Sequence, residues 1–143
     1  MLFRSNTPLS LAASYGHIDV VRLLLEHNAD ANSQDNIGYT PLHDVIRSDS
    51  FKAERTQMVQ LLLKHGANPN ARSRLKTPLH LASMNADLLD VSRLLLEHGA
   101  DLDAKDEGGK TPLQLSLENG HDELTRLFSE YPNKPMSGSV TSM

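Results

Sequence analysis

The chain has 143 residues, enough for one ordinary domain, a formal net charge of −4 and only 4% aromatic residues. A core with so few rings must be built from Leu, Ala and Val, which favours packed small helices over a β-sandwich or barrel. The acidic balance argues against nucleic acid and membrane partners, the lack of cysteine excludes disulfides and thiolate zinc sites, and no apolar run approaches the roughly 20 residues of a membrane span.

Two phrases recur along the chain. Thr-Pro-Leu begins at four threonines that are 33, 37 and 34 residues apart, namely Thr7, Thr40, Thr77 and Thr111. A leucine-rich phrase follows each one, at 20–32, 58–70, 91–103 and, in divergent form, 123–131. Repeats of this period indicate stacked supersecondary units. We expect one domain over 1–131 and a disordered tail over 132–143, with units at about 5–37, 38–74, 75–108 and 109–131.

Each unit is predicted to form two short antiparallel helices. The threonine suits the N-cap, and proline loses no hydrogen bond at the first helical position. Gly16 and Gly120 supply the turn between the helices, and the Leu-Leu-Leu of the second helix indicates burial between neighbours. The second helix should end at Gly66, Gly99 or Asn28, and a polar hairpin-like loop should follow.

This pattern resembles the ankyrin repeat. The residues that carry the resemblance are TPLH at 40–43 and 77–80, Gly-His at 16–17 and 120–121, LLLEHGAD at 94–101 and DEGGKTPLQ at 106–114. The resemblance covers nearly all of the chain before Tyr131. It implies an all-α, ankyrin-type solenoid of stacked helix-turn-helix repeats with hairpin-like finger loops. Members of the family bind other proteins through the fingers and the concave first helices.

All seven histidines fall in repeated slots. They are His43 and His80 in TPLH, His17 and His121 after the turn glycine, and His27, His65 and His98 at the end of the second helix. A catalytic or metal site needs different residues that converge on one point, whereas a repeated residue does the same local job in each unit. We therefore expect hydrogen-bonding roles for these histidines, and no catalytic, cofactor or metal site. No GxxxxGK[ST], GxGxxG, HExxH or GxSxG motif occurs.

The second unit departs from the pattern at 47–60, which holds about five extra residues and no Gly-His. Ser50 is a candidate cap for a longer second helix that begins near Phe51. Phe51, Arg55, Met58 and Leu62 would share one face of that helix. Two interpretations remain open, a tolerated loop insertion or a ledge that contacts a partner.

The loop at 70–76 also departs, because it lacks the glycine seen at Gly38 and Gly109. We predict a basic patch that favours an acidic or phosphorylated segment of a partner protein, and the alternative is a solvated loop with no preference. The patch comprises Arg72, Arg74 and Lys76 around Leu75, together with Arg47, Lys105 and Lys110. The other candidates on this face are Asn36, Ile37, Tyr39, Met84, Asn85 and Glu107.

The two ends of the array differ. In the last unit Leu127-Phe128-Ser129 replaces Leu-Leu-Leu, and the residues around it are Asp122, Glu123, Arg126 and Glu130. This unit is predicted to be a polar closing cap. The first unit has no such cap and should expose Leu, Ile or Val, which a missing preceding unit, a second copy or another molecule would cover. We predict a non-catalytic adaptor or scaffold in the cytoplasm, with the nucleus left open. The alternative is a targeting or inhibitory fragment of a longer ankyrin-containing protein that docks an enzyme.

Overall fold

The computed structural model describes residues 7–131, so the predicted tail at 132–143 lies outside the described residues. Helices α1, α3, α5 and α7 each open a unit, and α2, α4, α6 and α8 each close one. Their bounds are α1 (Pro8–Ser14), α2 (Ile18–Glu26), α3 (Pro41–Arg47), α4 (Lys52–Lys64), α5 (Pro78–Ser83), α6 (Leu89–Glu97), α7 (Pro112–Glu118) and α8 (Asp122–Glu130), with a short 3-10 turn, η1 (Ala86–Leu88), before α6.

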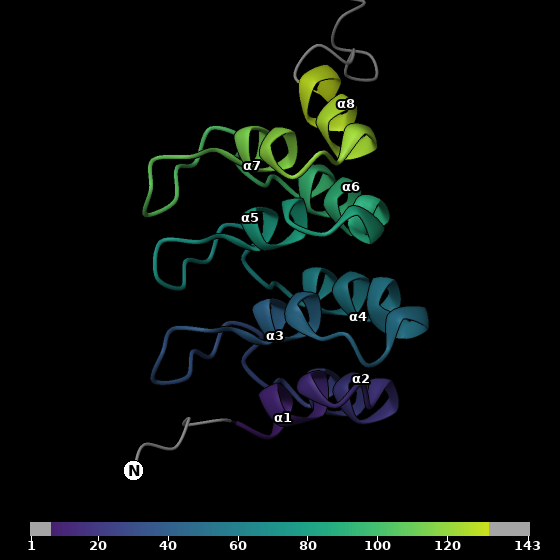
Figure 1. Cartoon of the computed structure of the whole chain (residues 1–143). Helices are drawn as coiled ribbons and strands as arrows, with labels where there is room; N and C mark the ends of the chain where they lie inside the picture. The colour runs from purple at the N-terminus through teal and green to yellow at the C-terminus, as the bar shows by residue number, and fades with distance from the viewer. Residues whose placement is uncertain (1–6, 132–143) are drawn as a thin grey trace, which may run out of the picture.

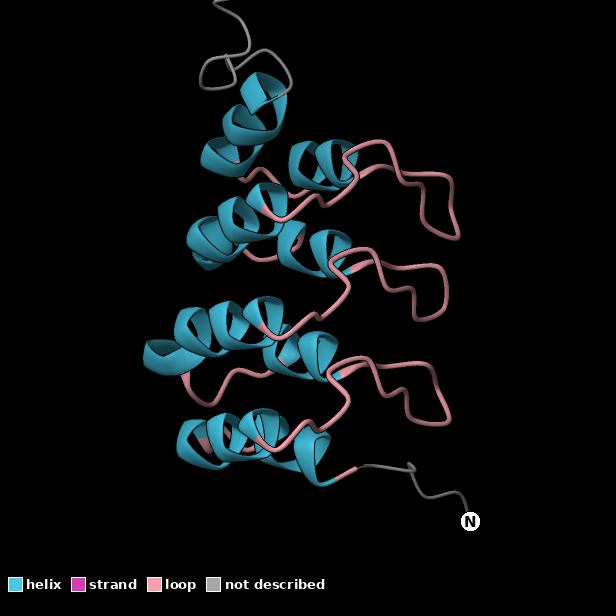
Figure 2. Ribbon diagram, turned by 180° about the vertical axis from the view of Figure 1, so that it is seen from behind, coloured by secondary structure: helices cyan, strands magenta, loops and turns pink. Residues whose placement is uncertain are grey.

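The helices stack in two columns (Figure 1). The first helices α1, α3, α5 and α7 pack on one another in sequence, and the second helices α2, α4, α6 and α8 do the same. Three long loops project from the same side of the stack (Figure 2). We call them the first finger (27–40), the second finger (65–77) and the third finger (98–111). Among the described residues the only β pairing is one isolated bridge in the second finger, so the predicted all-α solenoid is confirmed.

The Thr-Pro-Leu phrase forms the helix starts as predicted. In all four first helices the threonine Oγ1 accepts a hydrogen bond from the backbone N–H three residues later. His43 Nδ1 accepts from the backbone N–H of Thr40 at 3.1 Å, and its Nε2 donates to the carbonyl of Lys76 in the next finger at 3.3 Å. His80 repeats both bonds one unit later and reaches the carbonyl of Lys110 at 2.9 Å. Each TPLH imidazole therefore ties two units together, which confirms its structural role.

The second helices end with a shared histidine. In His27, His65 and His98 the ring Nδ1 donates to the carbonyl four residues earlier, at 2.9 to 3.0 Å. The next residue takes a positive φ, at Asn28, Gly66 and Gly99, as the sequence predicts. His17 and His121 begin α2 and α8 without a side-chain capping bond, so hydrogen bonding is not confirmed for that slot.

Asparagine side chains tie the bases of the fingers together. Asn32 donates from Nδ2 to the carbonyl of Gly66 at 2.9 Å and accepts from the backbone N–H of Asn68 at 2.7 Å. Asn70 makes the same two bonds to Gly99 and Asp101, at 3.0 and 2.8 Å. Because an amide both donates and accepts, one side chain satisfies two backbone groups of the following unit.

The insertion in the second unit belongs to the core. Helix α4 begins at Lys52, which confirms the predicted start near Phe51, but Phe51 is the N-cap and no side chain caps the helix, so the predicted Ser50 cap is wrong. Phe51, Arg55, Met58 and Leu62 are all buried. They cannot form a ledge for a partner, because their shared face packs against the stack.

Both ends of the stack expose apolar residues. Leu11, Val20 and Leu23 are each about half exposed at the N-terminal end, as predicted. At the other end, α8 is polar where earlier second helices are apolar, since exposed Ser129 takes the place of buried Leu25. The predicted closing cap is nevertheless incomplete, because Leu117 on α7 is 59% exposed whereas its counterpart Ile46 is 3% exposed.

Candidate functional site

One set of side chains that differ between units lies where each finger meets its first helix. The residue before the capping threonine and the residue seven positions after it are neighbours there, as contacts in the second and fourth units show. We call this surface the inner surface. It comprises Tyr39 and Arg47, Lys76 and Met84, and Lys110 and Glu118.

In the second unit the inner surface carries a cation–π pair. The guanidinium carbon of Arg47 lies 4.2 Å from the centre of the Tyr39 ring. Arg47 also approaches buried Asp44 at 3.8 Å, so its charge is partly compensated. The other edge of Tyr39 lies near the His43 ring, at a centroid distance of 5.8 Å. Tyr39 therefore offers a fixed, half-exposed aromatic face.

In the third unit the inner surface is apolar at its centre. Met84 follows α5 and is 40% exposed. The neighbouring candidate Asn85 is occupied, because its Oδ1 accepts from the backbone N–H of Asp87 at 2.9 Å and starts η1. Lys76 turns away to the third finger, where its Nζ lies 3.3 Å from Asp106 Oδ2. Met84 is thus the exposed apolar side chain on the inner surface of this unit.

The Lys76–Asp106 pair is built into the fold. Asp106 is buried, and its Oδ1 accepts hydrogen bonds from the backbone N–H groups of Gly108 and Lys110 at 2.9 Å. The backbone bond from Lys110, followed by the bond from the Lys76 side chain, lowers the pKa of Asp106 below its ordinary value. The carboxylate therefore stays ionised and keeps the Lys76 ammonium occupied.

Most cations of the predicted basic patch are bonded within the molecule. Arg72 Nη1 donates to the carbonyls of Leu75 and Lys105 at 3.1 and 3.0 Å, and Lys110 pairs with Glu118 at 2.7 Å. With Arg47 and Lys76 also engaged, four of the six predicted cations have partners inside the molecule. Arg74 and Lys105 are exposed and form no ion pair within 7–131. Arg72 and Lys76 find these partners because the stack brings acceptors of the third finger to the second.

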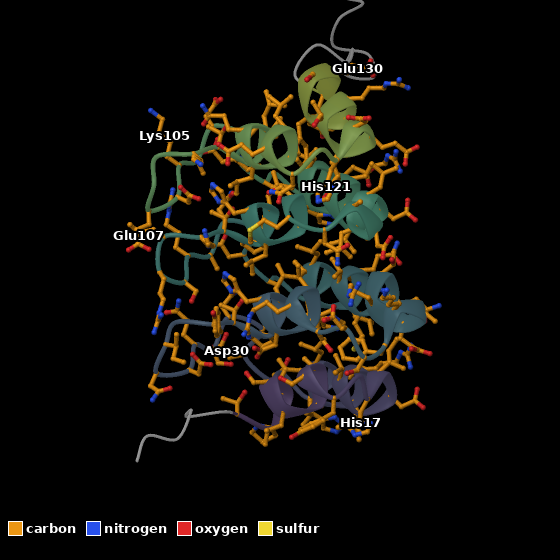
Figure 3. The ribbon with its side chains drawn as sticks, in the orientation of Figure 1. His17, Asp30, Lys105, Glu107, His121 and Glu130 are labelled. Carbon is orange, nitrogen blue, oxygen red and sulfur yellow. The ribbon has the colours of Figure 1, made fainter. Side chains whose placement is uncertain are left out.

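The remaining candidates lie on the fingers. Asn36 and Glu107 are exposed, and Ile37 is half-buried with its carbonyl accepting from Ser73 Oγ at 3.2 Å. Figure 3 shows Glu107 and Lys105 at the outer end of the third finger, away from the helices. Leu75 is 51% exposed in the second finger.

Two exposed residues, Glu118 and Tyr15, were not predicted from the sequence. Glu118 lies seven residues after Thr111, as Met84 lies after Thr77, so the repeat register would have identified it. Tyr15, directly after α1, is 69% exposed, and its ring stacks on His17 at a centroid distance of 6.3 Å.

The described part of the chain offers no metal site. Residues 7–131 contain no cluster of three or more His, Cys, Asp or Glu side chains that could hold a metal ion. His17 and His121 lie in the first and last units, far apart in Figure 3. None of the helices in this range is both long and apolar enough to cross a membrane.

Comparison with known proteins identifies relatives of the whole array. A family model described as "Ankyrin repeats (3 copies)" matches residues 3–73 and again 54–137. The chain is 35% identical over 124 residues to "Cyclin-dependent kinase 4 inhibitor B" of Rattus norvegicus, which covers 85% of this chain and 90% of that protein. It is 35% identical over 120 residues to "Cyclin-dependent kinase inhibitor 2A" of Homo sapiens, which covers 82% of this chain and 72% of that protein. It is also 36% identical over 137 residues to "Neurogenic locus notch homolog protein 1" of Xenopus laevis, over 93% of this chain and only 5% of that protein.

Proposed function

Because the chain belongs to the ankyrin-repeat family of protein-interaction modules, we propose that it is a non-catalytic adaptor that binds a partner protein through the inner surface and the finger tips. One observation carries the proposal. Histidines of the TPLH slot and of the helix ends, together with finger-base asparagines, are used in bonds within the stack. The half-exposed aromatic side chain of Tyr39 and the exposed apolar side chain of Met84 stay outside these bonds, and both lie on the inner surface.

The inner surface has the composition of a protein contact. Tyr39 and Met84 are apolar anchors in adjacent units, and Arg47 and Glu118 flank them with charge. Aromatic residues, Met and Arg are enriched in protein interfaces, and a few such anchors carry most of the binding energy. The acidic or phosphorylated partner segment predicted from the sequence is kept as part of the proposal. Its support comes from Arg72, Arg74 and Lys105, the three predicted cations without an ion pair among the described residues.

The proposal is tested with a phage-displayed library of random 16-residue peptides, panned against the chain. Tyr39→Ala/Met84→Ala should weaken the selected peptides at least about tenfold, since two buried anchors are worth more than roughly 1.4 kcal/mol. The matched control is Gln57→Ala/Lys64→Ala on the opposite, outer surface of α4, where both side chains are exposed. Loss of binding in the control with none in the inner-surface variant would reject the proposal.

A second candidate function is the inhibition of a kinase. It is favoured by the similarity to "Cyclin-dependent kinase 4 inhibitor B", which spans 90% of that protein. It matches the alternative prediction of an inhibitory array that docks an enzyme. Purified cyclin-dependent kinase 4 should then bind the chain saturably in calorimetry, and its activity should fall with the bound fraction. A titration without heat or inhibition removes this candidate and leaves the adaptor proposal standing.

Two further expectations belong to this proposal. We expect the protein to act in the cytoplasm or nucleus, without nucleic acid or membrane partners. The exposed N-terminal end, with Leu11, Val20 and Leu23, is a candidate for self-association. Sedimentation velocity over a hundredfold concentration range tests that idea, because a constant sedimentation coefficient would contradict it.

A further inference from the structure

The tip of the second finger has an unusual backbone. Arg74 and Leu75 have φ values of 49° and 65°, and the only other positive-φ residue besides glycine in 7–131 is Asn28. Ser73 and Lys76 exchange two backbone hydrogen bonds of 2.9 Å, so Arg74 and Leu75 form a two-residue hairpin loop. Two consecutive left-handed residues normally call for Asn-Gly. Without them the left-handed conformation is strained at both residues.

Side chains clamp this strained turn to both neighbouring fingers. Ser73 is buried and donates from Oγ to the carbonyl of Ile37 in the first finger at 3.2 Å. Arg72 bridges from the turn to the third finger, because its Nη1 bonds the carbonyls of both Leu75 and Lys105. The Lys76–Asp106 ion pair adds a second link to the third finger. These contacts hold a conformation that the local sequence disfavours.

The clamp leaves one apolar and two cationic side chains pointing to solvent. Leu75 is 51% exposed at the tip. Arg74 is the chain neighbour of Leu75, and the backbone of Lys105 lies close to that of Leu75, because Arg72 Nη1 bonds the carbonyls of both residues. Since the turn is already ordered, a partner that binds it does not meet the entropic cost of fixing a loop.

We propose that Leu75 is a preorganised anchor, which inserts into an apolar site on the partner that carries an anionic group beside it. The inference rests on the proposed adaptor function and adds the chemistry of the contact. Arg74 and Lys105 would flank the buried leucine and pair with the anion. The anion is a carboxylate or a phosphate, and both satisfy the two cations.

Two substitutions separate anchoring from folding. Leu75→Gly relieves the left-handed strain and removes the anchor, so the urea midpoint should rise while affinity for the selected peptides falls at least tenfold. Arg74→Asn relieves strain at the adjacent residue and keeps Leu75. Its affinity should fall by a smaller factor, and the salt dependence of binding should weaken. A Leu75→Gly chain that is more stable and binds as the wild type does would overturn the anchor.

The peptides selected from the random 16-residue library test the anion. They should carry Asp or Glu close to a bulky apolar residue, and replacement of that acid by Gln should weaken binding by the wild-type chain. A resynthesised peptide with phosphoserine at the acidic position identifies phosphate as the better source if it binds tighter, and carboxylate if it binds more weakly. Selected peptides without acidic residues would overturn the inference.

The outcomes also separate this inference from the adaptor proposal. If the Tyr39/Met84 double variant loses the peptides and Leu75→Gly keeps them, the adaptor proposal stands and the anchor fails. If neither variant changes binding, or the panning enriches no peptide, both fail.

Discussion

The buried imidazole of His43 has a structural role and holds its two hydrogen bonds in the neutral form. Desolvation by burial lowers the pKa of His43 to about 4, and burial likewise lowers the pKa of His80. Both rings are therefore neutral at pH 7, with Nδ1 accepting and Nε2 donating. In the fourth unit Gln114 takes the same position, and its Oε1 accepts from the backbone N–H of Thr111 at 2.9 Å. A non-titrating side chain thus performs the capping half of the job.

The lowered pKa makes stability depend on pH. The folded chain disfavours a proton on His43, whereas the unfolded chain takes one up below its ordinary pKa of 6.5. The free energy of unfolding should therefore be highest above pH 6.5 and fall as the pH drops from 6.5 to about 4. The loss from His43 alone is on the order of 3 kcal/mol. Urea titrations at half-unit pH steps measure it.

The fourth unit supplies the control variant. His43→Gln keeps the capping acceptor and abolishes titration, so its unfolding free energy should vary less over this pH window than that of the wild type. If the free energy of unfolding changes equally with pH in the two chains, His43 does not contribute to the pH dependence.

Two turn glycines differ in their surroundings. A Cβ on Gly16, with φ at +75°, would lie 2.5 Å from Phe51 Cδ1, whereas a Cβ on Gly120, with φ at +71°, meets nothing within 4 Å. Gly120→Ala should cost about 1–2 kcal/mol for the left-handed backbone alone. Gly16→Ala should cost roughly 1–3 kcal/mol more, because the buried Phe51 ring must move. Urea denaturation of both variants measures these losses in the free energy of unfolding. Equal losses would mean that the Phe51 ring moves aside without cost.

At the scale of an element, the second unit replaces a Gly-His turn with a buried arginine. Arg55 in α4 donates from Nε to the carbonyl of Val45 at 3.3 Å and from Nη2 to the carbonyl of Ser48. These carbonyls lie at the C-terminal end of α3, where the last turn of a helix leaves acceptors without partners. Arg55, which belongs to α4, thus caps the C-terminal end of α3. It also anchors the insertion in the core.

Removal of this arginine should be costly. Arg55→Met keeps the apolar packing but leaves two carbonyls unbonded, so we expect a loss of about 2–4 kcal/mol in the free energy of unfolding. Arg22→Met is the control, since exposed Arg22 pairs only with exposed Asp19 and should lose less than about 1 kcal/mol. Chemical denaturation compares them, and similar losses would contradict the capping role of Arg55.

Local signals predicted the elements well and failed where partners are distant in sequence. Thr-Pro at a helix start and Gly66 or Asn28 at a helix end act within a few residues, so the sequence alone identifies them. The period likewise predicted the face of α4 that holds Phe51 and Met58. The direction of that face was not predictable, because it depends on how α4 packs on its neighbours.

At the scale of the whole molecule, the same repeat position has different burial at the end and in the middle. Val20 in α2 is 45% exposed, and its counterpart Val91 in α6 is 2% exposed. Val91→Ala should cost about 1–2 kcal/mol, at roughly 0.8 kcal/mol for each buried carbon group, plus a cavity term. Val20→Ala should cost less than half as much in the isolated chain. Equal losses would indicate that the N-terminal end is covered in solution.

The same long-range effect limits prediction of the interaction surface. Sequence reasoning identified Leu75, Arg74 and Lys105 as candidates, and all three are exposed. It also selected Lys76 and Arg72, which are used within the stack, because their acceptors on Asp106 and Lys105 lie 30 and 33 residues away. Only the stacking of the fingers shows that a cation on one finger can be bonded by acceptors on the next.

The account rests on a division between residues that hold the stack and residues that recognise a partner. A scan that replaces each residue from 7 to 131 and scores every variant for folded abundance and for capture of the selected peptides tests it directly. Substitutions at His43, His80 and Asn70 should lower abundance, whereas Tyr39, Leu75 and Met84 should lower capture at unchanged abundance. Capture losses confined to the outer faces of α2, α4 and α6, with the inner surface and the second finger indifferent, would contradict it.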